Sequence, residues 1–150
     1  MERGRPLIAI LDDEEPVRRA LDRVVRAAHL CAVSYARGED FLAALPGLEP
    51  DCVLLDLNMP GLGGFETQRV LAAAAPGLPV VVLTAMDEPD ARERAMHAGA
   101  AAFLNKPVES QTLLDAIFRA IAKAGSCAAE TWSVSPPERR MTPRVEGLRK

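Results

Sequence analysis

Short apolar runs alternate with segments of helical spacing along most of this chain. An unbroken apolar run bounded by polar or turn residues is typical of a strand that is buried on both faces. Regular alternation of such strands with helices predicts a parallel sheet covered on both sides, and right-handed crossovers narrow the topology to a doubly wound α/β fold. The five predicted strands cover residues 7–11, 31–35, 52–56, 80–83 and 101–104.

A helix is predicted after each strand. Pro16 suits the first turn of the first helix, where its missing N–H is not needed, and Val17, Leu21 and Val24 follow at helical spacing. The fourth helix should pack loosely, because its apolar face holds only Ala91, Ala95, Met96 and Ala98. The predicted helices cover about residues 16–28, 38–45, 65–75, 89–98 and 109–123, and Pro46-Gly47 should end the second.

The chain divides into a domain over residues 1–124 and a tail over residues 125–150. The apolar residues of the tail do not recur at the spacing of a helix or a strand, and its prolines, serines and charges predict disorder. It is also basic, with five basic and three acidic side chains, so that residues 1–124 carry a charge of −5 within the net −3 of the chain. An acidic domain of this kind has no general attraction to nucleic acid or to anionic membranes.

The N-terminus and the cysteines indicate a cytoplasmic protein. The apolar run at residues 7–11 is too short for a signal peptide or a membrane span. Cys31, Cys52 and Cys127 are odd in number and widely spaced, which predicts neither a disulfide framework nor a zinc site.

Residues capable of chemistry follow four of the five predicted strands. Each has an ordinary explanation alone, because acids cap helices, threonine often ends a strand and most lysines are simply solvated. The carboxyl ends of parallel strands share one sheet edge, where such folds bind their ligands, so the joint pattern predicts a site. Its members are Asp12 and Asp13 after the first strand, Asp56 after the third, Thr84 after the fourth and Lys106 after the fifth.

This set of side chains predicts phosphoryl chemistry. Clustered carboxylates raise one another's pKa unless a cation lies among them. Oxygen ligands with room for water suit Mg²⁺, with Mn²⁺ as the alternative, and Mg²⁺ commonly binds phosphate beside one or two carboxylates. A carboxylate next to such an ion can attack a phosphoryl group and form an acyl phosphate. A lysine and a hydroxyl would then neutralise the phosphoryl oxygens.

Together, these motifs resemble the receiver domain of bacterial two-component response regulators, the CheY-like superfamily. The resemblance covers about residues 5–123 and rests on Asp12-Asp13, the stretch from Asp56 through Met59-Pro60-Gly61, Thr84-Ala85 and Lys106-Pro107. It implies a flavodoxin-like, three-layer (βα)5 fold with strand order 2-1-3-4-5. It also implies a cis bond between Lys106 and Pro107.

The resemblance assigns roles to the acidic residues. Asp56 would take a phosphoryl group from a sensor histidine kinase or a phosphotransfer protein, in a phosphorelay that requires Mg²⁺. Asp13 and Asp56 would bind the metal directly, joined by the main-chain carbonyl of Asn58, and Asp12 would act mainly through water. The domain would be a phosphoacceptor limited to its own phosphotransfer and dephosphorylation, with no turnover of an external substrate.

The resemblance also implies a switch. Lys106 and Thr84 would contact the phosphoryl oxygens, and Thr84 would move together with the inward-turning aromatic residue Phe103. An ordinary core role for Phe103 is the alternative. The surface formed by residues 89–98, 101–104 and the last helix would change, for binding of a downstream protein partner or for phosphorylation-dependent homodimerisation.

Two positions need separate expectations. Many relatives carry an acid at the position of Gly63, so Gly63-Gly64 should loosen the start of the following helix. Relatives vary at the position of Met86, which influences water access to the phosphoryl group. We expect the apolar Met86 to slow hydrolysis.

Two enzyme or ligand classes fit less well. An aspartate-nucleophile phosphatase needs a second acid two residues after its nucleophile, and the amide of Asn58 in that position cannot donate the proton. A flavin- or nucleotide-binding module needs a phosphate-binding loop after the first strand, where this chain has four acids.

The output of the domain is the remaining question. A stand-alone receiver that acts through protein contacts is the preferred interpretation, with nucleic acid not expected as a partner of this chain alone. The alternative is a DNA-binding transcriptional regulator whose helix-turn-helix output domain is missing or truncated. The tail segment Met141-Thr142-Pro143-Arg144 faintly resembles the opening of such a module, although chance is an adequate explanation for four residues.

Overall fold

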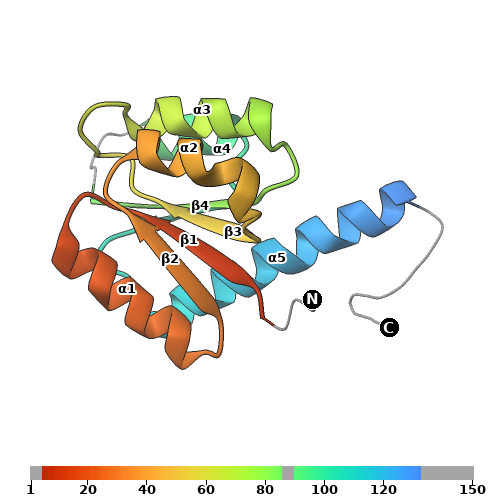
Figure 1. Ribbon diagram of the computed structural model, residues 1–150, viewed down its shortest axis with the longest axis horizontal. Coiled ribbons are helices and arrows are strands. Elements are labelled where there is room, and N and C mark those ends of the chain that lie inside the picture. Colours follow the sequence, from red (N-terminus) through yellow and green to blue (C-terminus); the bar gives the residue numbers. More distant parts are fainter. Residues whose placement is uncertain (1–4, 86–89, 133–150) are drawn as a thin grey trace.

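Five parallel strands form a single sheet in the order β2-β1-β3-β4-β5, which confirms the predicted topology (Figure 1). The computed structural model describes residues 5–85 and 90–132. Within this part of the chain, no helix is long and apolar enough to cross a membrane. The strands are β1 (Leu7–Leu11), β2 (Cys31–Tyr35), β3 (Cys52–Leu55), β4 (Val80–Thr84) and β5 (Ala102–Asn105).

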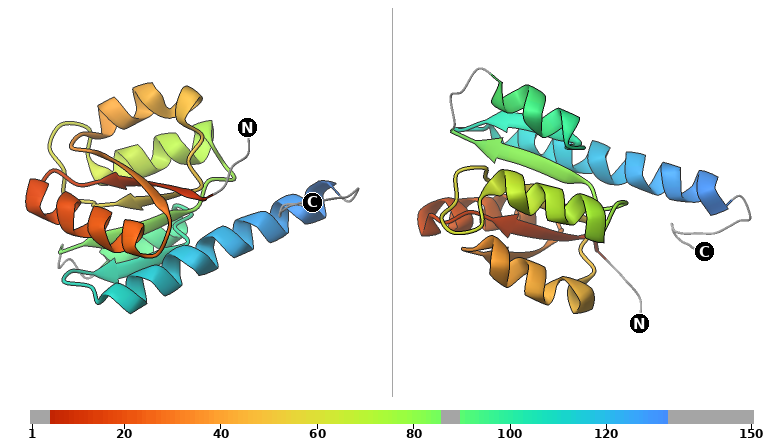
Figure 2. Two further views of the ribbon diagram at one scale, coloured as in Figure 1. Left: turned by 60° about the horizontal axis from the view of Figure 1, so that its bottom comes forward. Right: turned by 90° about the horizontal axis from the view of Figure 1, so that it is seen from above.

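Helices cover both faces of the sheet, as Figures 1 and 2 show. The helices α1 (Glu15–Ala27) and α5 (Ser110–Trp132) contribute to one hydrophobic cluster. The helices α2 (Gly38–Leu48), α3 (Gly64–Ala74) and α4 (Ala91–His97) contribute to the other.

Alternation along the central strands produces the two clusters. In β1, Ile8 and Ile10 belong to the cluster on the α1 and α5 side, whereas Ala9 and Leu11 belong to the cluster on the α2, α3 and α4 side. Because both faces are covered, every position of β3 and β4 is buried. This explains the unbroken apolar runs in the sequence.

The second helix extends further than the sequence predicted. Pro46 and Gly47 lie inside α2, which ends at Leu48, so the expected stop at Pro46-Gly47 was wrong. Leu45 and Leu48 are both packed against the hydrophobic cluster on this side of the sheet. Their burial stabilises the last turn despite the proline, and Glu49 then ends the helix in the left-handed conformation, with φ +52°.

The last helix also extends further, through Trp132 rather than residue 123. The helix therefore includes residues 125–132, the first eight residues of the predicted tail, and the expectation of disorder for the rest of the tail stays a prediction. Alanine has the highest helix propensity, and five alanines between Ala120 and Ala129 offset the cost of about 1 kcal/mol for Gly125. Residues 133–150, with the segment 141–144, lie outside the described residues.

The fourth helix is shorter than expected and buries less. It begins at Ala91 and ends at His97. Ala91 and Ala95 are buried, but Met96 is 39% exposed and Ala98 is exposed, so these two residues are not part of its inner face. The expectation for Met86 falls outside the described residues and stays a prediction.

Candidate functional site

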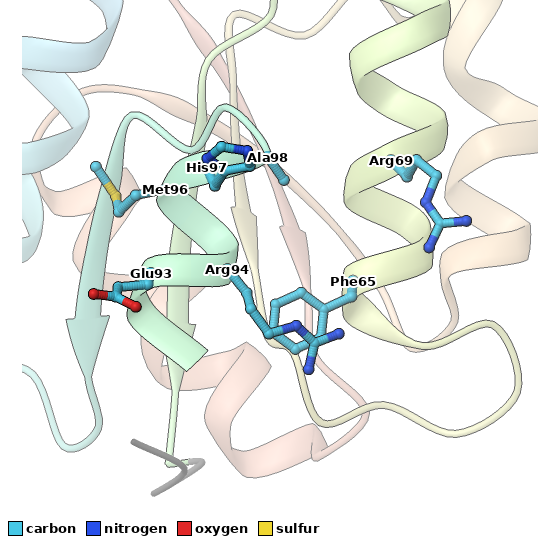
Figure 3. Close-up of a pocket in the computed structure, with 7 residues that line it drawn as sticks. All are labelled: Phe65, Arg69, Glu93, Arg94, Met96, His97 and Ala98. Atoms are coloured by element: carbon cyan, nitrogen blue, oxygen red, sulfur yellow. The ribbon is translucent and has the colours of Figure 1, made fainter. Parts of the chain in front are cut away.

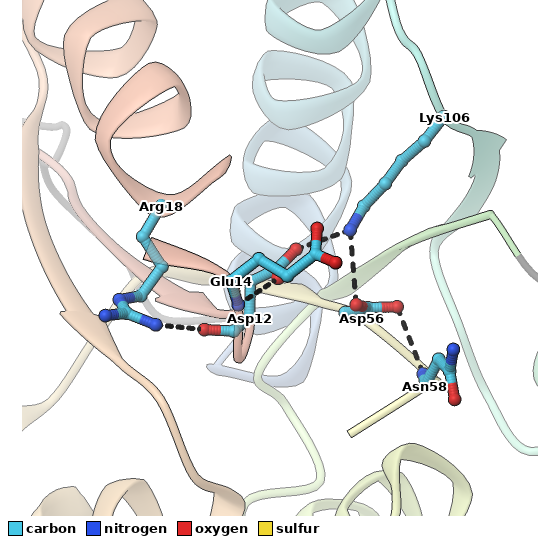
Figure 4. A network of polar contacts seen from close by, with 6 residues as sticks. All are labelled: Asp12, Glu14, Arg18, Asp56, Asn58 and Lys106. Atoms are coloured by element: carbon cyan, nitrogen blue, oxygen red, sulfur yellow. Dashed lines mark hydrogen bonds and ion pairs between the residues drawn. The ribbon is translucent and has the colours of Figure 1, made fainter. Parts of the chain in front are cut away.

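The first acidic pair directly follows β1, at the carboxyl end of the sheet. Asp12 is buried, and its backbone N–H donates to the Tyr35 carbonyl at 3.2 Å. The carboxylate of Asp12 accepts the N–H of Glu14 at 3.0 Å, and its main-chain carbonyl accepts Arg18 Nη1 at 2.7 Å (Figure 4). Asp13 is exposed. The pair thus offers one fixed carboxylate and one that faces solvent.

Asp56 follows β3 beside this pair. Its backbone N–H donates to the Leu11 carbonyl at 3.0 Å, which continues the pairing of β3 with β1. Its side chain is buried, and Oδ1 accepts the backbone N–H of Asn58 at 3.0 Å. Asn58 itself is exposed. The carboxylate is therefore held by a turn immediately after its strand.

Lys106 brings the two acidic strand ends together. Its backbone N–H donates to the Thr84 carbonyl at 2.9 Å, next to the last paired residues of β4 and β5. Figure 4 shows its Nζ between two carboxylates, 2.5 Å from Asp12 Oδ2 and 3.1 Å from Asp56 Oδ2. The bond that follows, Lys106–Pro107, is cis, as the resemblance implied.

Three carboxylates form a group that could hold a metal ion. Asp12, Asp13 and Asp56 each offer one oxygen, and these oxygens all lie within 4.8 Å of one another. One lysine leaves two of the three negative charges uncompensated. The set of oxygen donors, with an exposed member open to water, fits Mg²⁺.

Burial and charge shift the pKa values of the central pair. Burial raises the pKa of Asp56, and the neighbouring Asp12 charge raises it further, although the Asn58 N–H and the Lys106 charge oppose this shift. Burial lowers the pKa of Lys106, but its hydrogen bonds and charge attraction with the two carboxylates outweigh burial and raise that pKa overall. Lys106 therefore stays charged at neutral pH.

The two predicted switch residues lie on neighbouring strands. Thr84 is fully buried at the end of β4. Phe103 lies on the edge strand β5, opposite Val82 of β4, and is half-buried against the hydrophobic cluster on the α4 side. The guanidinium of Arg92 lies 5.9 Å from the centre of its ring. Phe103 is thus placed next to α4.

Sequence reasoning missed two residues that connect helices to this region. Gln68 of α3 is buried, and its Nε2 donates to the Ala95 carbonyl of α4 at 2.8 Å. Glu39 of α2 accepts the backbone N–H of Leu62 at 3.2 Å. The Gln68 contact joins residues 27 positions apart, and the Glu39 contact joins residues 23 positions apart. A local sequence motif therefore could not have predicted either contact.

A groove of about 810 Å³ lies between α3 and α4 (Figure 3). Arg94 of α4 stacks over Phe65 of α3, with its guanidinium carbon 3.8 Å from the ring centre. No residue of the carboxylate and lysine cluster lines this groove. It is therefore a feature separate from the site at the strand ends.

The sequence profile of the response regulator receiver domain matches residues 8–118. This match covers β1 from Ile8, the other four strands in full and the beginning of α5, and it includes all of the candidate site residues. The chain belongs to the response regulator receiver family, as the resemblance indicated.

Two relatives illustrate the match. The transcriptional regulatory protein FixJ of Bradyrhizobium diazoefficiens is 33% identical over 151 residues, which cover 94% of this chain and 72% of FixJ. The DNA-binding transcriptional regulator NtrC of Salmonella typhimurium is 33% identical over 122 residues, which cover 81% of this chain and 26% of NtrC. This chain therefore spans about a quarter of the length of NtrC.

Two solved structures are also similar to most of this chain. A response regulator receiver protein from Burkholderia phymatum is 38% identical, with a TM-score of 0.71 over 79% of this chain and 96% of that chain. The structure titled FixJ-N is 32% identical, with a TM-score of 0.73 over 80% of this chain and 96% of that chain. Receiver domains act as phosphoacceptors in two-component signalling, where response regulators interact with histidine kinases and downstream targets.

Proposed function

We propose that Asp56 accepts the phosphoryl group in this receiver domain. The observation that carries this proposal is the placement of its carboxylate, 3.1 Å from Lys106 Nζ and within 4.8 Å of the Asp12 and Asp13 oxygens. Asp13 is exposed, whereas Asp12 is held beneath Lys106 by hydrogen bonds. Asp56 follows β3, the central strand of the sheet, and each of its oxygens keeps acceptor capacity beyond the Asn58 N–H and the Lys106 ammonium group.

Mg²⁺ would be held by Asp13 and Asp56, with the main-chain carbonyl of Asn58 as a third ligand and Asp12 acting through water. Mn²⁺ would fit the same oxygen donors. When bound, the ion supplies positive charge to the phosphoryl oxygens. The donor chemistry supports this assignment, because three carboxylates with one lysine leave a net negative site.

The transfer step forms one bond and breaks one. An Asp56 carboxylate oxygen attacks phosphorus, and the P–N bond of a phosphohistidine donor breaks. The imidazole nitrogen keeps the electron pair and takes up a proton. Lys106 neutralises charge on the phosphoryl oxygens, and the Thr84 hydroxyl donates to one of them. We propose a histidine kinase or a phosphotransfer protein as the donor.

The proposed switch uses Thr84 and Phe103 to change the surface of α4, β5 and α5. Only Ala91 and Ala95 of α4 are buried, so a small apolar area holds this helix in place. A two-state element held by few contacts can be shifted by a few kcal/mol. The changed surface would bind a downstream protein or a second copy of the chain.

A second candidate function is DNA binding through an output domain beyond the receiver. The FixJ alignment favours it, because it covers 94% of this chain and so continues past the receiver. A gel-shift assay of the 150-residue chain at stated salt tests the stand-alone interpretation. Sequence-specific binding by this chain would overturn it.

The phosphoacceptor assignment is tested with acetyl phosphate, Mg²⁺ and intact-mass measurement. We expect one added phosphoryl group in the wild type and none in Asp56→Asn. The exposed Asp40, outside the cluster, supplies the control Asp40→Asn, which should react like the wild type. Removal of Mg²⁺ with EDTA should suppress the reaction. A phosphoryl group still added to Asp56→Asn would contradict the assignment.

A further inference from the structure

A carboxylate on α2 reaches across to the loop between β3 and α3, which carries Asn58. We propose that Glu39 is a positioning residue for the metal site and that it acts by fixing this loop. The inference rests on the proposed function, in which the Asn58 carbonyl is a metal ligand. It assigns to α2, which contributes no residue to the carboxylate and lysine cluster, a role in metal binding.

The contact is made with the middle of the loop. Glu39 Oε2 accepts the Leu62 N–H at 3.2 Å and lies 3.6 Å from Arg37 Nη2. At Gly61 a Cβ atom would come within 2.8 Å of the same oxygen and 3.2 Å of Arg37 Nη2. Gly61 has φ +70°, so glycine suits this position both in conformation and in space. The loop backbone at Gly61 and Leu62 therefore lies in direct contact with the Glu39 side chain.

The ends of the loop are fixed by other means. At the start, the Asp56 N–H donates to the Leu11 carbonyl at 3.0 Å. At the end, the Gly64 N–H donates to the Leu57 carbonyl at 3.2 Å. Asn58 lies exposed between these ends, and its own N–H is already bound to Asp56. Glu39 adds a third point of attachment at Leu62, which follows Asn58 in the chain.

The charge of Glu39 is suited to this role. Backbone hydrogen bonds from its own N–H and from Leu62 lower the pKa of Glu39, and the Arg37 charge lowers it further. The carboxylate is therefore ionised at neutral pH, and a hydrogen bond to a charged acceptor is stronger than one between neutral groups. Arg37 Nη2 lies 3.6 Å from the same oxygen in an exposed ion pair.

Loss of this attachment should weaken metal binding without abolishing it. The carboxylates of Asp12 and Asp56 are held by contacts that do not involve Glu39. Only the position of the Asn58 carbonyl would become less well defined. Groups that orient metal ligands typically contribute 10-fold to 100-fold in affinity, and for an exposed residue acting through a loop we expect about 3-fold to 10-fold.

The test is titration calorimetry of the full chain with Mg²⁺ alone, comparing four proteins. Glu39→Ala should raise the dissociation constant about 3-fold to 10-fold. Glu39→Gln retains an acceptor for the Leu62 N–H and should recover most of the affinity. Asp40→Ala is the matched control, because it removes the same charge from the next residue of the same helix turn, and it should bind like the wild type.

Amide hydrogen exchange supplies a readout that does not depend on the metal. In metal-free protein, the Leu62 amide should exchange faster in Glu39→Ala but not in Asp40→Ala. Equal Mg²⁺ affinity in wild type and Glu39→Ala would overturn the role of Glu39 and leave the proposed function intact. An equal loss in Asp40→Ala would assign the effect to charge alone and would also overturn it. Failure of the wild type to bind Mg²⁺ would overturn both proposals.

Discussion

Lys106 Nζ lies 3.1 Å from Asp56 Oδ2, although the two residues are 50 positions apart in the chain. The ends of β3 and β5, with β4 between them, bring this pair together. The same ammonium group also contacts Asp12. Lys106 is therefore a single cation shared by two buried carboxylates, and its removal should affect both.

Substitution of Lys106 should slow phosphorylation of Asp56. Lys106→Ala removes the cation that neutralises charge on the phosphoryl oxygens, and loss of one such group commonly costs a factor of 10² or more. We expect at least about a tenfold lower rate with acetyl phosphate and Mg²⁺, measured by intact mass over time. The exposed Lys123 of α5 provides the control Lys123→Ala. An unchanged rate in Lys106→Ala would remove Lys106 from the reaction.

Stability should depend on pH through Asp56. Burial raises the pKa of this residue above its ordinary value of 3.8. In the pH range above 3.8 and below the raised pKa, the folded chain binds more protons at Asp56 than the unfolded chain does. The contribution of Asp56 to stability therefore falls as pH rises through this range.

Comparison with Asp56→Asn isolates this effect. Because the amide does not titrate, the free energy of unfolding of the variant minus that of the wild type should increase as pH rises from about 4 toward the raised pKa of Asp56. Urea unfolding in metal-free buffer measures the difference. Asp40→Asn, an exposed acid, is the control for titration elsewhere in the chain. A difference that is constant or decreases with pH would contradict the expected direction.

Gly64 should tolerate no side chain, in contrast to its neighbour Gly63. A Cβ atom at Gly64 would lie 2.2 Å from Leu57 Cα and 2.7 Å from the Asp56 carbonyl oxygen, both of them backbone atoms. We expect Gly64→Ala to lower the free energy of unfolding by about 1–3 kcal/mol. It should also slow phosphorylation, because the backbone of Asp56 has to shift.

The matched control is Gly63→Ala, since a Cβ atom at Gly63 would meet nothing within 4 Å. Its φ of −68° is ordinary for alanine, so the substitution should change stability by no more than about 0.5 kcal/mol. Chemical denaturation of both variants measures the contrast. If both lost stability equally, helix capping rather than close packing would explain the effect.

The sheet and the cluster at its edge could be predicted from local sequence patterns. Buried parallel strands give unbroken apolar runs, and β3 and β4 are buried at every position. The order of strands and helices then places Asp12, Asp56 and Lys106 at one edge of the sheet without further information. The strand order itself came from the family resemblance.

Helix ends and contacts between helices could not be predicted in the same way. Pro46 gives a strong local stop signal, but α2 continues through Leu48, which is partly buried against the hydrophobic cluster. The last turns of α5 have no apolar period, although alanine propensity favours a helix there. Glu39 is one of several acids near the start of α2, and only the folded chain shows which loop amide it meets.

The separation of the two hydrophobic clusters lowers the free energy needed to displace α4 during switching. The sheet separates them, so the apolar contacts beneath α1 and α5 do not include those beneath α4. On its own side, α4 buries two alanines and accepts the Gln68 hydrogen bond at the Ala95 carbonyl, and its other printed contacts are made by the exposed Arg92 and Arg94. A displacement of α4 therefore leaves half of the core unchanged, and this local opening costs far less free energy than unfolding the domain.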